Sequence, residues 1–467
     1  MPQQVSRSAA LFVVCVAHFL MPFMMSAVGV ALPAMGREFG ASAMQLGLVE
    51  TTYVLSASIF LLAMGRLGDI HGRRRVFQAG IAVFTLIGGA LSQAWSIEAV
   101  IGLRFLQGMG GSMVMATTMA IVVSVFPPEE RGKALGIAIA SVYAGISCGP
   151  FIGGALVSTL GWRSLFYLCV PLGVITYLIS RAKLRAEWAE AKGEPFDWQG
   201  SLIYAASILL LIAGASNLDH GPWAWLLMFC GLAGVGAFLA FEGRTPYPVL
   251  NVALLRRNRV FALSNLAALF NYAATFGVTF FLSLYLQYVK GMDPHQAGSV
   301  LIVQPIAQTL LSPLCGRLAD RIPAGRVATA GMALCAAGLG IAASISASTP
   351  LAVILTLLVF LGMGFALFSS PNVSVIMGSV EPRYLGVASG LNSSMRTLGM
   401  MTSMTIITVI FSVFMGGHAV TAATQDAFLR SMQTALTVFC GLCLLGIFCS
   451  LGRLGGTPSR QQQGGPR

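Results

Sequence analysis

The sequence predicts an all-α membrane protein in which 14 transmembrane helices form two six-helix bundles and an inserted helix pair. Only 9% of the 467 residues are charged, whereas a soluble domain carries about 25%. The apolar residues gather in runs long enough to cross a bilayer, and a short polar motif recurs between such runs in each half of the chain. Repeated halves in a membrane chain are typical of transporters whose site lies between them.

Fourteen segments have the length of about 20 apolar residues that a spanning helix needs. They are expected near residues 9–32, 44–65, 76–95, 97–125, 133–158, 163–182, 199–217, 223–241, 260–286, 294–315, 327–346, 350–371, 384–415 and 431–452. This grouping predicts an N-terminal bundle over residues 1–185, a central segment over 186–258 and a C-terminal bundle over 259–455. The first run has no small-residue cleavage site, so we expect a span rather than a signal peptide.

The distribution of Lys and Arg predicts the orientation of these helices. With the amino terminus in the cytoplasm, cytoplasmic loops and tails hold 22 of the 28 basic residues, as the positive-inside rule requires. Both termini are therefore expected to be cytoplasmic. The formal net charge of +12 follows from these scattered basic loops, so it does not indicate a protein that binds nucleic acid.

The segments between the spans are too short to hold a catalytic domain. Residues 183–198 are expected to form a short amphipathic surface helix, and the Gly-, Gln- and Pro-rich tail 456–467 is expected to be disordered. The chain has no GxxxxGK[ST] loop for ATP, and its nine cysteines show no metal-ligand spacing. We therefore expect no cofactor, and the spans hold no nucleophile–base pair that would suggest an enzyme.

The repeated motif predicts a latch that joins the two bundles. One copy follows the second span, and the other follows the second span of the C-terminal six. Glycines permit tight turns and close helix approach, and an aspartate at a helix end can meet the positive N-terminus of another helix. A basic loop required only for topology is the alternative, but it would not need a second copy. The candidate latch residues are Gly65, Gly68, Asp69, Gly72 and Arg73 in the first copy, with its three glycines in a tight cytoplasmic turn, and Gly316, Asp320 and Arg321 in the second.

A glycine-rich stretch in the middle of the fifth predicted span is a candidate hinge. Proline removes a backbone hydrogen bond and kinks a helix, while glycines let a neighbouring helix pack closely. An idle kink is the alternative. The candidate hinge residues are Gly145, Gly149, Pro150, Gly153 and Gly154.

Two ionisable residues inside predicted spans form the candidate proton-coupling pair. Glu50 lies six residues into the second span and Arg104 seven residues into the fourth, which is roughly 9 to 10 Å from the same membrane face. Intramembrane ionisable residues are functional candidates by default. The alternatives are a hydrated glutamate near the interface and an arginine that only ties helices together.

These motifs resemble those of the major facilitator superfamily. Residues 65–75 resemble its signature loop, Leu103–Gly110 its fourth-helix motif, and Gly145–Gly154 the fifth-helix motif associated with antiporters. Residues 161–173 and 30–33 resemble motifs of its fourteen-helix drug:proton antiporter branch. The resemblance implies a secondary transporter in a bacterial inner membrane.

One position departs from that branch. The branch usually carries an acidic residue nine positions before Pro33, where this chain has Met24. The usual candidate for a proton-binding carboxylate is therefore missing, and Glu50 is the candidate replacement.

Other polar residues and methionines in the spans are weaker candidates for substrate contacts. They are His18, Met25, Gln107, Asn271, Tyr272, Gln304, Gln308 and Arg396. A hydrogen-bonded packing histidine is the simpler interpretation of His18. Arg396 is expected near the cytoplasmic end of the thirteenth span, where its long side chain can instead reach the interface.

We expect a monomer in the lipid bilayer that exports small amphipathic organic compounds or drugs by proton-coupled antiport and alternating access. Sodium can take the place of the proton, because a lone carboxylate can bind either ion. A uniporter or a proton symporter for a metabolite is the alternative, which the missing acid favours and the fifth-helix motif opposes. A non-transporting receptor or scaffold fits less well, because no segment is long enough for a sizeable extramembrane domain.

Overall fold

Long apolar runs that end at polar capping residues account for the helices of this chain. In the computed structural model, which describes residues 6–215, 217, 221–415 and 424–453, all regular structure is helical. The Ser6 side chain accepts from the N–H of Ala9 to cap the first helix, and Ser42 forms a capping box with Gln45 at the start of the second. Among the described residues, 14 helices are long and apolar enough to span a membrane. The predicted fold class and helix count are therefore confirmed.

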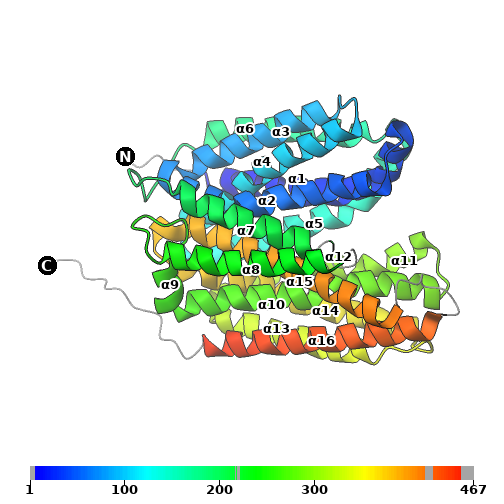
Figure 1. Ribbon diagram of the computed structural model, residues 1–467. Helices are drawn as coiled ribbons and strands as arrows, with labels where there is room; N and C mark the ends of the chain where they lie inside the picture. The colour runs from blue at the N-terminus through cyan, green and yellow to red at the C-terminus, as the bar shows by residue number, and fades with distance from the viewer. Residues whose placement is uncertain (1–5, 216, 218–220, 416–423, 454–467) are drawn as a thin grey trace.

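The first six spans pack together as one bundle, drawn in blue and cyan in Figure 1. Helix α1 packs against α5, α2 against α4, and α3 against α4 and α6. The bounds of these helices are α1 (Arg7–Phe39), α2 (Ala43–His71), α3 (Arg73–Leu91), α4 (Ile97–Val125), α5 (Pro128–Leu160) and α6 (Arg163–Lys183).

The last six spans pack as a second bundle, in which α10 contacts α15 and α16, and α13 contacts α14 and α16. Short helix α9 (Val252–Arg257) precedes its first span, and a π-helical turn, η2 (Tyr285–Val289), ends that span. Short helix α11 (Pro294–Leu301) forms the start of the next span. The remaining bounds are α10 (Arg259–Leu284), α12 (Val303–Arg321), α13 (Ala324–Ala343), α14 (Leu351–Gly378), a 3₁₀ turn η3 (Pro382–Tyr384), α15 (Leu385–Met415) and α16 (Gln425–Gly452).

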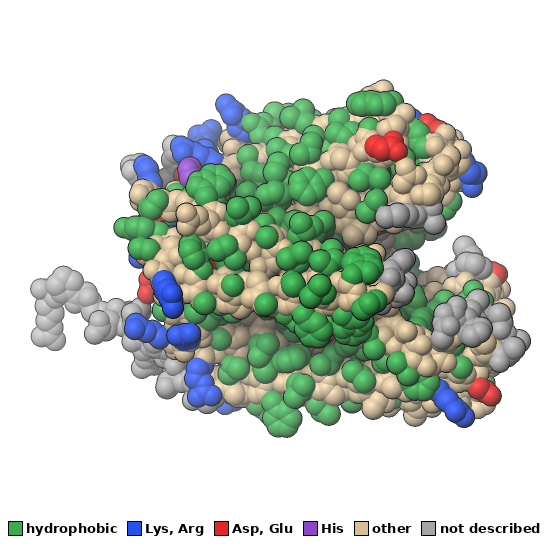
Figure 2. Space-filling model, viewed as in Figure 1, with side chains coloured by type: hydrophobic (Ala, Val, Ile, Leu, Met, Phe, Trp, Pro, Cys, Tyr) green, Lys and Arg blue, Asp and Glu red, His purple; other side chains and the backbone are tan. Residues whose placement is uncertain are grey.

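The two bundles meet mainly through α2 with α15 and α5 with α12, and α4 also contacts α15 and α5 also contacts α14. The inserted helices α7 (Trp198–Ala215) and α8 (Pro222–Glu242) lie beside this junction, where α7 contacts both α2 and α15. We call the side on which α1 begins and α16 ends the terminal side. Figure 2 shows that a hollow separates the bundles at the opposite side of the molecule.

The first latch motif is more helical than predicted. Helix α2 continues past Gly65 and Gly68 to His71, and only Gly72, with φ of 112°, forms the turn into α3. The prediction of a turn made by all three glycines was therefore wrong for two of them. Gly65 and Gly68 instead leave room for close neighbours, which are the backbone of α15 and the side chain of Thr117, respectively.

The predicted surface helix over residues 183–198 is absent, because the described segment between α6 and α7 is irregular. Its backbone groups pair with the corner between α2 and α3: the N–H of Arg73 donates to the carbonyl oxygen of Trp188, and the N–H of Ala191 donates to that of Asp69. These bonds replace the internal bonds that a helix would need. The tail 456–467 lies outside the described residues.

Candidate functional site

Asp69, at the terminal side of α2, joins the two bundles. One carboxylate oxygen accepts a hydrogen bond of 2.9 Å from the N–H of Gly386, and the other accepts one of 3.0 Å from the N–H of Val387. These amides belong to the first turn of α15, where the helix N-terminus attracts negative charge. Asp69 is fully buried and forms an ion pair of 2.7 Å with Arg73. Arg73 also donates to the carbonyl oxygen of Pro382 in the opposite bundle.

Asp320 makes the equivalent contact from the C-terminal bundle. Its carboxylate accepts hydrogen bonds of 2.7 Å and 2.9 Å from the N–H groups of Gly132 and Lys133, the fifth and sixth residues of α5. Gly316 lies so close to Gly132 that a side chain on either would overlap the other's backbone. The two predicted latch copies therefore bridge the same junction in opposite directions. Arg321, however, is exposed at the end of α12 and does not repeat the buried pairing of Arg73.

A third connection, which sequence reasoning missed, runs through the irregular segment between α6 and α7. The Glu194 carboxylate pairs with Arg66 of α2 and, at 2.8 Å, with Arg383 near the start of α15. All three connections lie at the terminal side, so the bundles are held together there and apart at the other side.

The candidate hinge glycines form a groove in α5 that receives α1. A Cβ atom on Gly149 would lie 2.6 Å from Cβ of Ser26, and one on Gly153 would lie 2.8 Å from Cβ of Ala27. The same stretch also contains Gly145, which faces the carbonyl oxygen of Phe19, whereas Gly154 has more space and Pro150 is exposed. Close α1–α5 packing is therefore a property of this motif, while its hinge role stays a prediction.

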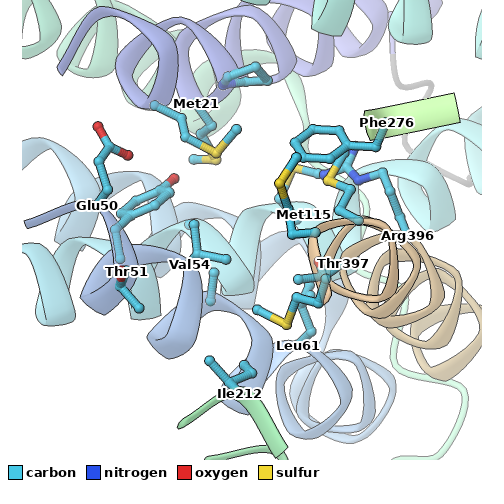
Figure 3. A pocket seen from close by; sticks show the side chains of 18 of the residues that line it. Met21, Glu50, Thr51, Val54, Leu61, Met115, Ile212, Phe276, Arg396 and Thr397 are labelled. Atoms are coloured by element: carbon cyan, nitrogen blue, oxygen red, sulfur yellow. The ribbon is translucent and has the colours of Figure 1, made fainter. Parts of the chain in front are cut away.

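A cavity of about 470 Å³ lies between the bundles. Residues of α1, α2, α4, α5, α7, α10 and α15 line it, and its walls are largely apolar (Figure 3). Six methionines contribute to these walls: Met21, Met25, Met115, Met400, Met401 and Met404. Met24, at the position of the missing acid, is fully buried and is not among the lining residues.

Glu50 lies at one side of this cavity (Figure 3), whereas Arg104 is not among the lining residues. A carboxylate oxygen of Glu50 lies 3.8 Å from the Arg104 guanidinium, and the Glu50 side chain is 27% exposed. Arg104 is fully buried, donates to the carbonyl oxygen of Val49 and to Gln107, and lies over the ring of Tyr53. Of the two residues, only Glu50 is among those that line the cavity. Their role as a proton-coupling pair stays a prediction.

Arg396 lies at another side of the same cavity (Figure 3), so of the two alternatives for this residue the structure favours a place beside the cavity over one at the interface. It is eleven residues past the start of α15 at Leu385, and most of the intervening residues are buried. Its side chain is partly exposed and lines both this cavity and a smaller one next to it. Substrate binding by Arg396 stays a prediction.

A smaller cavity of about 30 Å³ adjoins the first and shares Met115, Val142 and Arg396 with it. His18 and Tyr272 line this smaller cavity. The His18 ring is fully buried, with Nδ1 3.2 Å from the carbonyl oxygen of Ala138 and Nε2 2.6 Å from the hydroxyl of Thr118. These contacts favour a packing role for His18, while its substrate contact stays a prediction.

The remaining candidates for substrate contacts lie outside both cavities. Gln107 is held by Arg104, and Asn271, Gln304 and Gln308 are buried in α10 and α12 without being among the lining residues. Substrate binding by them stays a prediction. The sequence did not predict that Ile212 of α7 would line the main cavity. The inserted helices have no counterpart in the two repeated halves, so the repeat gives no indication of where they pack.

Comparison with known proteins adds independent evidence. The sequence model described as Major Facilitator Superfamily matches residues 14–401 and 264–466. A riboflavin transporter of Clostridioides difficile is 27% identical over 94% of this chain and 96% of its own length. The multidrug resistance protein Stp of Mycobacterium tuberculosis is 30% identical over 80% of this chain and 70% of its own. A cephamycin export protein of Amycolatopsis lactamdurans is 30% identical over 84% and 83%.

A solved structure supports the fold. The human organic anion transporter MFSD10 superposes with a TM-score of 0.69, covering 96% of this chain and 100% of its own, at 14% sequence identity. At this identity the similarity concerns the fold alone.

Proposed function

Because the chain belongs to the major facilitator superfamily, and is therefore a multi-pass membrane transporter and not an enzyme, we propose that it exports small amphipathic organic compounds in exchange for protons. The relatives described as multidrug resistance and antibiotic export proteins support export. The observation that carries the proton coupling is Glu50, a carboxylate that faces the central cavity 3.8 Å from a buried arginine.

The proposal includes an orientation. The basic residues of the loops favour a cytoplasmic terminal side, and the bacterial relatives favour an inner membrane. The structure then corresponds to an outward-open state, because the three connections close the terminal side and the hollow lies at the other. A proton from outside can reach Glu50 in this state.

Protonation of Glu50 can couple proton binding to the conformational change of the transporter. A neutral carboxyl attracts Arg104 less than a carboxylate does, so the proton alters the contacts between α2 and α4 beside the cavity. The populations of the outward-open and inward-open states then change, because the two states differ in their affinity for the proton and the substrate. The latches at Asp69 and Asp320 determine the equilibrium between the two states before the proton or the substrate binds.

The proposal is tested with purified protein in liposomes that contain a pH-sensitive dye. An imposed proton gradient is challenged with lipophilic cations, neutral drugs and organic acids. We expect substrate-dependent proton movement that Glu50→Gln reduces at least 100-fold, because glutamine cannot release a proton. Glu98→Gln is the matched control, since Glu98 lies in the first turn of α4 outside both cavities. Proton movement that persists in Glu50→Gln would exclude Glu50 as the carrier.

Transport of a flavin without a proton is a second candidate function. The riboflavin transporter aligns with nearly the whole chain, and Met24 removes the usual acid of the antiporter branch. Riboflavin movement into the same liposomes with no change of the internal dye would favour this candidate over antiport.

A further inference from the structure

Arg396 is a cation without a protein counter-ion in the central cavity. Over the residues that the structure describes, no hydrogen bond or ion pair holds its guanidinium, and the buried Nε atom has no hydrogen-bond partner. A charge in an apolar site is costly unless it is paired. An arginine in this position is therefore typical of a binding site that a ligand completes.

The residues around Arg396 supply no negative charge. The smaller cavity places His18 of α1, Tyr143 of α5, Tyr272 of α10 and Ser369 of α14 near it, and none of these is acidic. Among the described residues that line the main cavity, Glu50 is the one acidic residue, and it already has Arg104 as its cation. The lining thus carries one unmatched positive charge.

The rest of the cavity fits an apolar body. Met115 and Phe276 lie between Arg396 and the centre of the cavity in Figure 3, and methionines of α1 and α15 form much of the wall. Methionine side chains are flexible and polarizable, so they adapt to flat ligands of different outline. A cavity of about 470 Å³ lies in the range that holds drug-sized ligands.

We propose that the compounds this protein exports are amphipathic organic anions, whose carboxylate or sulfonate binds Arg396 while the apolar body lies against the methionines. The claim that these anions are exported rests on the proposed function, whereas the claim that the site binds them rests on the cavity alone. Guanidinium binds a carboxylate through two parallel hydrogen bonds. Lipophilic cations would meet like charge at Arg396.

The test measures binding with three fluorescent probes that share one aromatic body: dansylglycine (anionic), dansylamide (neutral) and dansylcadaverine (cationic). Their emission rises on entry into an apolar cavity, so binding to the purified protein in nanodiscs is followed directly, without transport. We expect dansylglycine to bind about tenfold more tightly than dansylamide, and dansylcadaverine to bind more weakly than either.

The variants separate the role of Arg396 from folding. Arg396→Gln should lower dansylglycine affinity about tenfold and leave dansylamide affinity unchanged, which also shows that the cavity is intact. Arg396→Lys should restore part of the loss, because it restores the charge but not the paired donors. Arg430→Gln, at an exposed arginine of α16, is the matched control and should change nothing.

The outcomes distinguish this inference from the export proposal. Unchanged dansylglycine affinity in Arg396→Gln, a preference of the wild type for dansylcadaverine, or no binding of any probe would overturn the inference. Proton-driven export of neutral or cationic compounds alongside any of these results would leave the export proposal standing. Selective, Arg396-dependent binding of dansylglycine without proton-driven export would support the inference and exclude the export proposal.

Discussion

The carboxylate of Asp69 in α2 accepts a hydrogen bond of 2.9 Å from the backbone N–H of Gly386, 317 residues further along the chain. Asp320 binds two backbone N–H groups near the start of α5 in a similar manner, so each bundle contributes one carboxylate and the N-terminal part of one helix to the closed side. The two bonds differ in their surroundings. Asp69 is buried and paired with Arg73, whereas Asp320 is half-buried and has no equivalent of that arginine.

This difference predicts unequal effects of two matched substitutions. Asp69→Asn leaves the Arg73 guanidinium buried without a counter-charge, which lowers the stability of the closed terminal side by about 3 kcal/mol. Asp320→Asn loses charge-assisted hydrogen bonds only, which costs about 1 to 2 kcal/mol. To measure this, Ser393→Cys is introduced into each variant, and a membrane-impermeant maleimide is added at the terminal side. The labelling rate of the new cysteine is the rate observed minus the rate of the same variant without Ser393→Cys.

Ser393 suits this measurement because it is 6% exposed and lies between the bundles at the smaller cavity. Labelling should increase strongly in Asp69→Asn and less in Asp320→Asn. Equal rates in both variants would show that the buried Asp69–Arg73 ion pair adds nothing to the hydrogen bonds that each aspartate makes across the junction.

The glycines of the junction give a second prediction. A Cβ atom on Gly65 would overlap the carbonyl oxygen of Gly386, which is backbone and cannot rotate away. Gly65→Ala should therefore push α2 from α15 and lower the stability of the closed state by about 1 to 3 kcal/mol. Gly47→Ala in the same helix is the control, because nothing lies within 4 Å of the position that its Cβ would occupy. The thermal midpoint should fall for Gly65→Ala alone.

The helix count was predictable from the sequence, because the length of an apolar run is a local property. The latch residues were predictable as a pair from their repetition, but their partners were not. The amides that Asp69 and Asp320 bind lie near the starts of α15 and α5, and any residue except proline can supply a backbone N–H. The sequence therefore indicates the carboxylate acceptor and the kind of partner, a helix N-terminus, but not which helix supplies it.

The sequence left two alternatives open for Arg396, the cytoplasmic interface and the substrate site. A long basic side chain near a helix end can reach the interface. The first turns of α15 are largely buried and Arg396 lines the cavities between the bundles, which is a tertiary arrangement that no local pattern contains. Segment 183–198 was likewise predicted as a helix from its own residues, whereas its backbone pairs with the α2–α3 corner.

Arg104 gives a third prediction, which separates charge from geometry. Its guanidinium donates to the carbonyl oxygen of Val49 and to Gln107 while it faces Glu50. Lysine keeps the charge but lacks the fork of donors, so Arg104→Lys should leave Gln107 unpaired and displace the cation from Glu50. We expect proton-driven transport to fall at least tenfold while the protein still folds. Transport at the wild-type rate would show that charge alone suffices at this position.

The fourth prediction concerns Glu194, which pairs with arginines of both bundles. Arg383 is 44% exposed, so solvent screens its pair with Glu194 and limits the contribution to about 1 kcal/mol or less. The pair with Arg66 is more buried, at 3% exposure for the arginine, and a single substitution, Glu194→Gln, removes both. Closure of the terminal side should therefore weaken by less than in Asp69→Asn, and the same Ser393→Cys labelling assay measures it. Glu190→Gln makes the same charge change at an exposed residue of the same segment and should leave labelling unchanged. Equal labelling in Glu194→Gln and Glu190→Gln would show that the ion pairs of Glu194 do not stabilise the closed terminal side.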